Sequence, residues 1–200
     1  MMTPLKIFLP IYFLLFFGLA MFWRSYIAWK RTGINPYKLG NGDTVHDFVG
    51  KLFRLTLIAT ALIVVVFSFM YQYYEWLSPI AWMNSSVLVL IGIALLVLAL
   101  IWVLVAQLQM GDSWRIGIDE ETKSALVQHG LFGVSRNPIF LGMLIMLVGL
   151  LLLLPTAVTL TITVLGFVLI HVQVRLEEAF LTEQYGEDYR KYQMSVRRWI

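Results

Sequence analysis

The stretch VLVLIGIALLVLALIWVLVA, residues 87–106, decides the fold class of this chain. It contains no charged side chain, and its length matches the roughly 20 residues that a helix needs to cross a hydrocarbon core about 30 Å thick. Four further apolar stretches follow the same pattern: 5–23, 55–70, 138–154 and 156–174. The 200-residue chain is 60% hydrophobic and 14% charged, with a mean hydropathy of +0.78. This composition lies far outside that of soluble globular proteins. We therefore predict an all-α integral membrane protein with about five transmembrane helices.

The basic residues indicate how these helices are oriented. Fourteen of the 15 Lys and Arg residues lie after the first span, after the third span or in the C-terminal tail, and Lys6 is the exception. Because basic residues accumulate on the cytoplasmic side, this bias places the N-terminus outside and a helical C-terminal tail in the cytoplasm. The first span lacks a small-residue cleavage site and ends in Trp23 and Arg24, so we expect it to remain as an anchor.

Composition argues against several kinds of site. The chain has no cysteine, which excludes disulfides and thiolate nucleophiles, and its three histidines lack the paired spacing of metal ligands. No metal is therefore expected. The net charge of +3 comes from residues that flank the spans, so no nucleic-acid partner is expected either. The sequence also lacks a strand followed by a glycine-rich turn, which argues against a Rossmann domain.

The last two apolar stretches are expected to form a helical hairpin. They are joined only by the region around Pro155, so the two helices must run antiparallel. Gly142 and Gly149 lie seven residues apart and should let another helix pack closely.

One candidate site lies in GLFGVSRNPIFLG, residues 130–142, where charge meets an apolar helix. Asn is a preferred N-cap and Pro is favoured at the first helical position, so Asn137 and Pro138 are expected to begin the fourth span. A cap does not explain Arg136, which lies at the unfavourable end of the helix dipole. Arg136 can form an anion site with the free backbone N–H groups, or it can extend to lipid headgroups.

A second candidate site follows the last span, in RLEEAFLTEQYGEDYRKY, residues 175–192. His171, Arg175 and Glu178 share one stripe of the helix, and ionisable groups at this depth usually face a cavity. Arg175 and Glu178 can instead form a weak surface pair. Glu177 points to another face, so the two carboxylates should have different partners. The helix is expected to extend past the membrane and bend near Gly186, so that the tail can fold back as a lid.

These motifs together resemble a known family. With GDSWRIGI upstream and RRW near the terminus, they are similar to the integral-membrane methyltransferases of the isoprenylcysteine carboxyl methyltransferase type and to the related phospholipid methyltransferases. The resemblance covers roughly residues 100–200. The matching positions are Arg136, Asn137, Pro138 and Phe140 in an Arg-His-Pro-x-Tyr element, Arg175, Glu177 and Glu178 in an Arg-x-Glu-Glu element, and the aromatic pair Tyr189 and Tyr192.

The chain also departs from the family pattern. Asn137 stands where the family usually has histidine, and Phe132 and Phe140 replace two usual tyrosines. The common Gly-Pro-Tyr-Arg beginning is Gly-Leu-Phe-Gly at residues 130–133, which removes one basic residue. An imidazole and two hydroxyl groups are therefore missing from any site built on these positions.

The resemblance implies that S-adenosylmethionine binds in a cytoplasm-facing pocket of the last helices and the tail. A lipid-like or prenylated substrate would enter from the bilayer, and its expected acceptor is a carboxylate, such as a prenylcysteine-like α-carboxyl. The residues expected to bind the cofactor are Asn137, Pro138, Phe140, Glu177, Glu178 and Tyr189. Arg136 and Arg175 are expected to be catalytic, by positioning the acceptor.

Three alternatives remain open at this stage. A phospholipid N-methyltransferase would need a base for its amine acceptor, such as His171 or one of the glutamates. A sterol-reductase-like enzyme shares part of the C-terminal motif, and a non-enzymatic scaffold or small transporter belongs to a different class. We also expect two regions: residues 1–86 with two spans and a basic cytoplasmic loop, and residues 87–200 as a methyltransferase-like core.

Overall fold

The computed structural model describes residues 2–36, 44–115 and 125–200. The predicted basic loop therefore lies partly outside the described residues. The elements are α1 (Met2–Leu15), the π-helix η1 (Phe16–Trp23), α2 (Arg24–Thr32), α3 (Val45–Phe69), η2 (Tyr71–Leu77), η3 (Ala81–Met83), α4 (Ser86–Met110), η4 (Gly111–Ser113), η5 (Gly130–Gly133), α5 (Pro138–Leu153), α6 (Ala157–Tyr185) and α7 (Glu187–Ser195). Within the described residues the only β interaction is an isolated bridge between Pro79 and Thr156.

The long helices confirm the predicted all-α membrane fold. Four helical stretches are long and apolar enough to cross a membrane: Thr3–Thr32, Val45–Phe69, Ser86–Ser113 and Ala157–Tyr185. The remaining predicted span, α5, has 16 residues, which is about 24 Å of helix. Because this is shorter than a core of about 30 Å, the number of spans stays a prediction.

Glycines bring α4 and α5 together, as the sequence predicted. A Cβ added at Gly149 would lie 3.1 Å from the backbone oxygen of Gly92, and one added at Gly142 would lie 2.5 Å from a Val103 methyl. Without these side chains the two backbones approach closely, which is how helices associate in membranes. The predicted hairpin of α5 and α6 is also present, and it turns at Pro155.

The caps explain where several helices begin. Thr44 and Asp47 form a capping box at the start of α3, in which the Asp47 backbone N–H donates to the Thr44 hydroxyl at 3.2 Å. Thr156 accepts from the backbone N–H of Thr159 at 3.0 Å and so caps α6. These bonds satisfy donors that a helix start otherwise leaves unpaired in an apolar environment.

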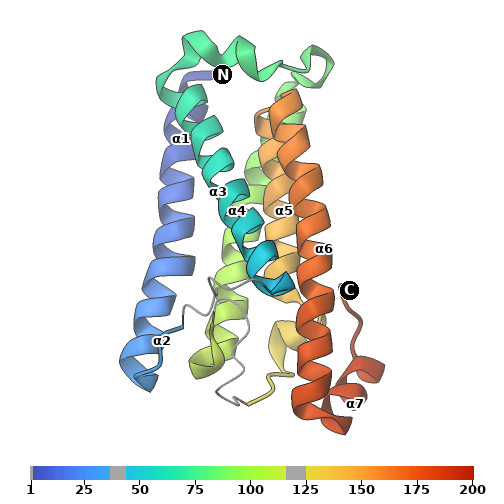
Figure 1. Ribbon diagram of the computed structural model, residues 1–200. Coiled ribbons are helices and arrows are strands. Elements are labelled where there is room, and N and C mark those ends of the chain that lie inside the picture. The colour runs from blue at the N-terminus through green and yellow to red at the C-terminus, as the bar shows by residue number, and fades with distance from the viewer. Residues whose placement is uncertain (1, 37–43, 116–124) are drawn as a thin grey trace.

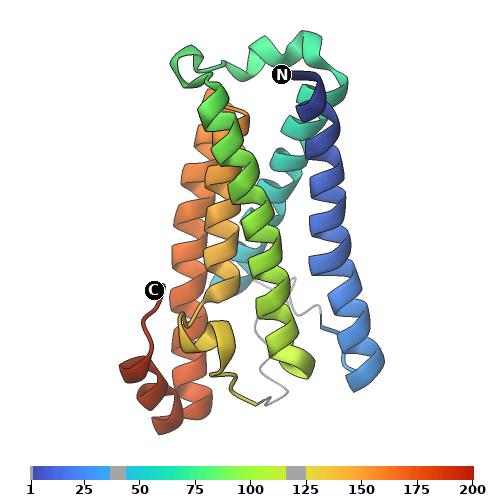
Figure 2. The same cartoon turned by 180° about the vertical axis from the view of Figure 1, so that it is seen from behind.

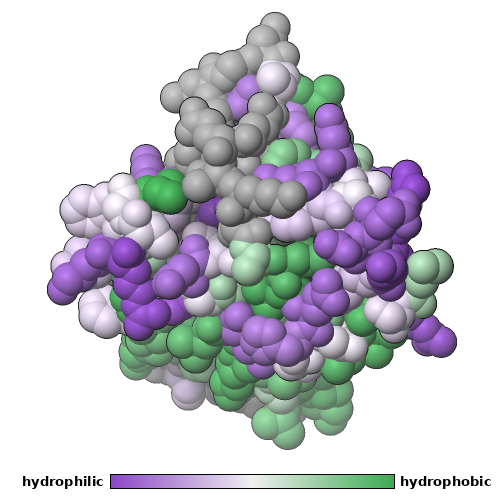
Figure 3. All heavy atoms as spheres, turned by 90° about the horizontal axis from the view of Figure 1, so that it is seen from below, coloured by the Kyte–Doolittle hydropathy of each residue, from purple (hydrophilic) through white to green (hydrophobic). Residues whose placement is uncertain are grey.

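The two ends of the bundle differ in their elements and in their polar residues. Figure 1 shows the N-terminus, η2 and η3 at one end, whereas α2, the end of α4 and α7 lie at the other, and Figure 2 shows the same arrangement from behind. Figure 3 views the end that contains α7, where hydrophilic residues form a band across the middle and hydrophobic residues lie at the centre and along the lower edge. We call this the polar end. It contains the described basic residues except Lys6, and its orientation relative to the cytoplasm stays a prediction.

Candidate functional site

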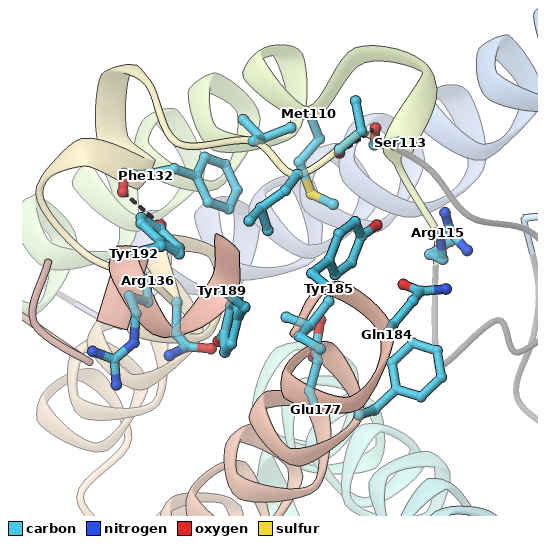
Figure 4. Close-up of a pocket in the computed structure, with 16 residues that line it drawn as sticks. Met110, Ser113, Arg115, Phe132, Arg136, Glu177, Gln184, Tyr185, Tyr189 and Tyr192 are labelled. Atoms are coloured by element: carbon cyan, nitrogen blue, oxygen red, sulfur yellow. Dashed lines mark hydrogen bonds between the residues drawn. The ribbon is translucent and has the colours of Figure 1, made fainter. Parts of the chain in front are cut away.

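A cavity opens at the polar end, between the end of α4, the segment before α5, and the helices α6 and α7 (Figure 4). It has about 720 Å³ of empty space, counting the part that is open to solvent. Its lining residues are Met110, Ser113, Arg115, Ala125, Leu126, Val127, Phe132, Arg136, Asn137, Glu177, Phe180, Leu181, Gln184, Tyr185, Tyr189 and Tyr192. The wall is thus mainly apolar and aromatic with a few polar groups, as in most small-molecule sites.

The bend at Gly186 builds the aromatic wall. Gly186 has φ +56°, a conformation that favours glycine, and it turns α7 back so that Tyr189 and Tyr192 line the cavity. The Tyr192 hydroxyl donates to the Phe132 carbonyl at 2.6 Å, which ties α7 to η5. Burial raises the pKa of Tyr192 to about 12 and raises the pKa of Tyr189 above its usual range. Both phenols therefore stay protonated and neutral at physiological pH.

Glu177 projects from α6 into this cavity (Figure 4). Its side chain is half-buried, and within the described residues no hydrogen bond or ion pair holds its carboxylate. Arg115 lines the same cavity and acts on Glu177 electrostatically. A carboxylate that is removed from water without a bonded partner is costly, so this position suits a positively charged ligand group.

Glu178 has a different environment, although it is the next residue. It is 4% exposed, and both of its oxygens are bonded. Oε1 accepts from Arg136 at 3.0 Å and from the Asn137 amide at 3.1 Å, and Oε2 accepts from Arg198 at 2.8 Å. We call these four residues the Glu178 clamp. Two guanidinium groups and one amide thus bond to a single carboxylate, and such partners keep a buried carboxylate ionised.

The Glu178 clamp also holds the C-terminal tail. Arg136 donates to the carbonyls of Gln193 at 3.1 Å and Val196 at 2.6 Å, and its backbone N–H donates to the carbonyl of Arg197 at 3.0 Å. The hydrogen bond to Glu178 raises the pKa of Arg198 above its usual range. The tail is therefore fixed against the start of α5, and most of the donors of Arg136 are used within the protein.

The structure brings only some of the predicted site residues to the cavity. Arg136, Asn137, Glu177 and Tyr189 line it, whereas Glu178 does not. Pro138 is buried at the start of α5, and Phe140 packs against the core. Arg175 is exposed and donates to the carbonyl of His171 at 3.1 Å on its own helix, so it does not share a contact with Glu178.

The predicted role of the Asn137 side chain as a cap is wrong. Asn137 does occupy the N-cap position of α5, but its side chain makes no capping hydrogen bond. Its amide donates to Glu178 and to the carbonyl of Arg198 at 3.2 Å instead. A buried carboxylate that needs donors competes successfully with the backbone for this amide.

Sequence reasoning missed several lining residues. Phe180, Gln184 and Tyr185 lie three, seven and eight positions after Glu177, so helical periodicity from Glu177 would have found this face. Arg198 belongs to the RRW motif, which does not indicate a partner for it. A buried glutamate requires cationic partners, but the sequence alone does not show which arginine folds back to it.

Comparison with known proteins identifies the segment that builds this cavity. A family model described as phospholipid methyltransferase matches residues 87–188, which is just over half of the chain. The matched segment contains α4 except its first residue, together with η4, η5, α5 and α6, and every lining residue except Tyr189 and Tyr192 lies within it. No curated protein matches the chain.

Proposed function

Because the chain belongs to the phospholipid methyltransferase family, which includes the isoprenylcysteine carboxyl methyltransferase-like membrane enzymes, we propose that its cavity binds S-adenosylmethionine. The family makes the protein a membrane methyltransferase. We further propose that the methyl group passes to a lipid-like acceptor that reaches the cavity from the bilayer. The observation that carries this proposal is Glu177, a carboxylate to which none of the described residues bonds, in an aromatic cavity of the matched segment.

The residues of the cavity fit the donor molecule. S-adenosylmethionine supplies a methyl group on a positively charged sulfonium and has an ammonium group and an adenine ring. Glu177 can accept charge-assisted hydrogen bonds from the ammonium group. Phe132, Tyr185 and Tyr189 offer ring faces for the adenine and for the cationic sulfur. The neutral phenols add no negative charge that would compete with Glu177 for the ammonium.

The contribution of the protein to methyl transfer is alignment and exclusion of water. Displacement at a methyl group requires the attacking atom to approach in line, so rigid walls around both reactants lower the barrier. The Glu178 clamp fixes the tail, and the contact between Tyr192 and Phe132 fixes α7 against η5. These contacts hold the aromatic wall in one arrangement and limit the entry of water.

We propose a carboxylate acceptor, such as a prenylcysteine-like α-carboxyl. A carboxylate is already ionised at neutral pH and needs no base. Arg115 and Arg136 line the cavity and are the groups that we place beside it, although Arg136 keeps few donors for this contact. Arg175 lies outside the lining, so we propose no contact between it and the acceptor.

A phospholipid amine is the second candidate, and two observations favour it. The matching family model is described as phospholipid methyltransferase, and Glu177 could take the proton of an ammonium acceptor. In that case Glu177 would act as a base instead of binding the donor's ammonium group. Glu177 would therefore have a different role with each acceptor.

Methyl transfer by purified protein tests the proposal. The detergent-purified chain is incubated with S-adenosylmethionine that has a labelled methyl group, beside a prenylcysteine analogue, phosphatidylethanolamine or lipid extract. Base-labile label in the prenylcysteine product supports the carboxylate, because methyl esters hydrolyse, and base-stable label in phospholipid supports the amine. No transfer to any acceptor, with folded protein, would contradict the proposed activity.

We also propose that the cavity faces the cytoplasm. The proposal rests on the basic residues, since those in the described ranges, except Lys6, lie at the polar end. The chain has no cysteine, so Ser195→Cys and Asn84→Cys place single exposed thiols at the polar and the opposite end. An impermeant reagent added to intact cells should label position 84 and spare position 195. Labelling of position 195 would place the cavity outside.

A further inference from the structure

A second polar contact lies outside the cavity, where the first long helix meets α4. Arg24, the first residue of α2, is 7% exposed, and its guanidinium donates to the carbonyl of Gln107 at 2.6 Å. Gln107 is 2% exposed, and its side-chain amide donates to the carbonyl of Ala20 at 2.9 Å. Each helix thus donates one hydrogen bond to the other. We call this reciprocal pair the Arg24–Gln107 contact.

The end of α4 explains why an arginine is needed. In a regular α-helix the N–H of Gly111 would donate to the carbonyl of Gln107, but it bonds to Leu108 instead. The carbonyl of Gln107 is therefore left without its helical donor, and Arg24 supplies one. A cation at a helix C-terminus is also favoured by the helix dipole. Arg24 reaches the carbonyl of Gly111 as well, at 3.5 Å.

The same turn of α4 supports one wall of the cavity. Met110 and Ser113 flank Gly111 and line the cavity, and Figure 4 shows them on the wall opposite Glu177. The side-chain carbonyl of Gln109 accepts from the backbone N–H of Leu131 at 2.8 Å, which connects this turn to η5. A displacement at the end of α4 would therefore move the wall that faces Glu177.

We propose that Arg24 is a positioning residue for the cavity: by holding the end of α4, it keeps Met110 and Ser113 at the distance from α6 that donor binding requires. The inference rests on the proposed function, and it gives residues outside the matched segment a part in that function. Arg24 does not touch the cavity itself.

The chain provides a matched control on the same helix. Arg31 of α2 pairs with Asp112 of the same turn at 3.6 Å, but both side chains are more than 60% exposed. Exposed pairs of this kind contribute little. If Arg24 acted only by adding a positive charge near this turn, Arg31→Ala and Arg24→Ala would have similar effects.

The experiment compares full-length variants in detergent by calorimetric binding of S-adenosylhomocysteine and by methyl-transfer kinetics. Arg24→Ala should raise the Kd about tenfold, which corresponds to losing one charge-assisted hydrogen bond. Turnover of the folded fraction at saturating donor should change less than about twofold, because Arg24 touches neither reactant. Arg24→Lys, which can still donate to one carbonyl, should recover part of the affinity, and Arg31→Ala should bind like the wild type.

A folded Arg24→Ala variant that binds with wild-type affinity would overturn the inference. If Arg24→Ala does not fold, Gln107→Leu is measured in its place, because it removes only the side-chain amide and leaves the carbonyl that Arg24 binds. Its Kd should rise about threefold, since it loses one neutral hydrogen bond, and an unchanged Kd would overturn the inference.

A second readout separates this inference from the proposed function. Met110→Cys gives a single thiol in the wall, and its labelling rate needs no donor molecule. Adding Arg24→Ala, or Gln107→Leu where Arg24→Ala does not fold, should accelerate labelling about threefold, which corresponds to local opening that is easier by about 0.65 kcal/mol. Faster labelling in a protein that binds no S-adenosylhomocysteine would support the positioning role and contradict the proposed function. Unchanged labelling would overturn the positioning role.

Discussion

Glu177 and Glu178 are neighbours in the sequence, but α6 turns their side chains toward different parts of the molecule. Glu178 lies in the clamp, where Arg136, Asn137 and Arg198 use both of its oxygens. Glu177 lies in the cavity wall, where no described residue bonds to it. A rotation of about 100° per residue produces this difference. Identical side chains one position apart can thus serve stability and ligand binding separately, according to which partners the fold supplies.

Substitutions at the two glutamates should therefore change different properties of the protein. A change in the Glu178 clamp should lower stability first and affect binding only through the fold. A change at Glu177 should affect binding and leave stability nearly unchanged, because no hydrogen bond or ion pair with a described residue is lost.

The largest effect is expected for Glu178→Gln. The substitution leaves Arg136 and Arg198 without their carboxylate, and breaking a buried ion pair costs about 3 kcal/mol or more of the free energy of unfolding. Thermal and denaturant unfolding in detergent measure it. Glu183→Gln, at an exposed position of the same helix, is the control and should stay within about 0.5 kcal/mol of the wild type. Equal stability of the two variants would contradict the clamp.

The next largest effect is expected for Asn137→Asp. The new carboxylate would lie against Glu178 Oε1, 3.1 Å from the present amide, and would remove two donors from the clamp. We expect a loss of about 2 kcal/mol, greater than for Asn137→Ala, because two carboxylates repel each other. A capping role predicts the reverse order, since Asp caps well and Ala does not. If Asn137→Asp is more stable than Asn137→Ala, Asn137 acts as a cap and does not belong to the Glu178 clamp.

Tyr192→Phe tests the contact that connects α7 to η5. It removes the hydroxyl that donates to Phe132 at 2.6 Å and should cost about 1 kcal/mol of the free energy of unfolding. Tyr26→Phe, at an exposed position of α2, is the matched control. A loss no larger than that of the control would show that α7 is held by the clamp alone.

The smallest effect is expected for Arg175→Ala. Arg175 is exposed, and among the described residues it bonds only to a carbonyl of its own helix, so stability and donor affinity should both stay within about 0.5 kcal/mol of the wild type. Binding of S-adenosylhomocysteine and unfolding are measured on the same preparation. A large loss of S-adenosylhomocysteine binding would show that Arg175 belongs to the site and that the site extends beyond the lining residues named above.

The fold was predictable because its determinants are local. The apolar runs determine where the long helices lie. Gly142 and Gly149 allow the close packing of α4 and α5, and Gly186 allows the bend before α7. The separation of Glu177 from Glu178 also followed from helical geometry alone. Their partners did not, because Arg136 and Arg198 lie 42 and 20 residues from Glu178 and reach it only through the tertiary fold.

The partners in the Arg24–Gln107 contact were even harder to predict from the sequence. Gln107 stands at the end of an otherwise apolar span, and a polar side chain there is a recognisable signal for an interhelical bond. Its partner helix lies 87 residues away, at Ala20, and no periodicity connects the two. For Asn137 the sequence predicted a local contact that is absent. The preference of Asn for N-cap positions predicted a capping bond, but the side chain donates to Glu178, which is distant in the sequence.

Calorimetry of Glu177→Gln tests whether Glu177 binds the methyl donor while Glu178 stabilises the fold. S-adenosylhomocysteine is titrated into the detergent-purified variant, the wild type and Glu183→Gln. We expect at least about tenfold weaker binding for Glu177→Gln, because a charge-assisted hydrogen bond is lost, and an unchanged melting temperature. Wild-type affinity in a folded Glu177→Gln variant would show that Glu177 does not bind the donor.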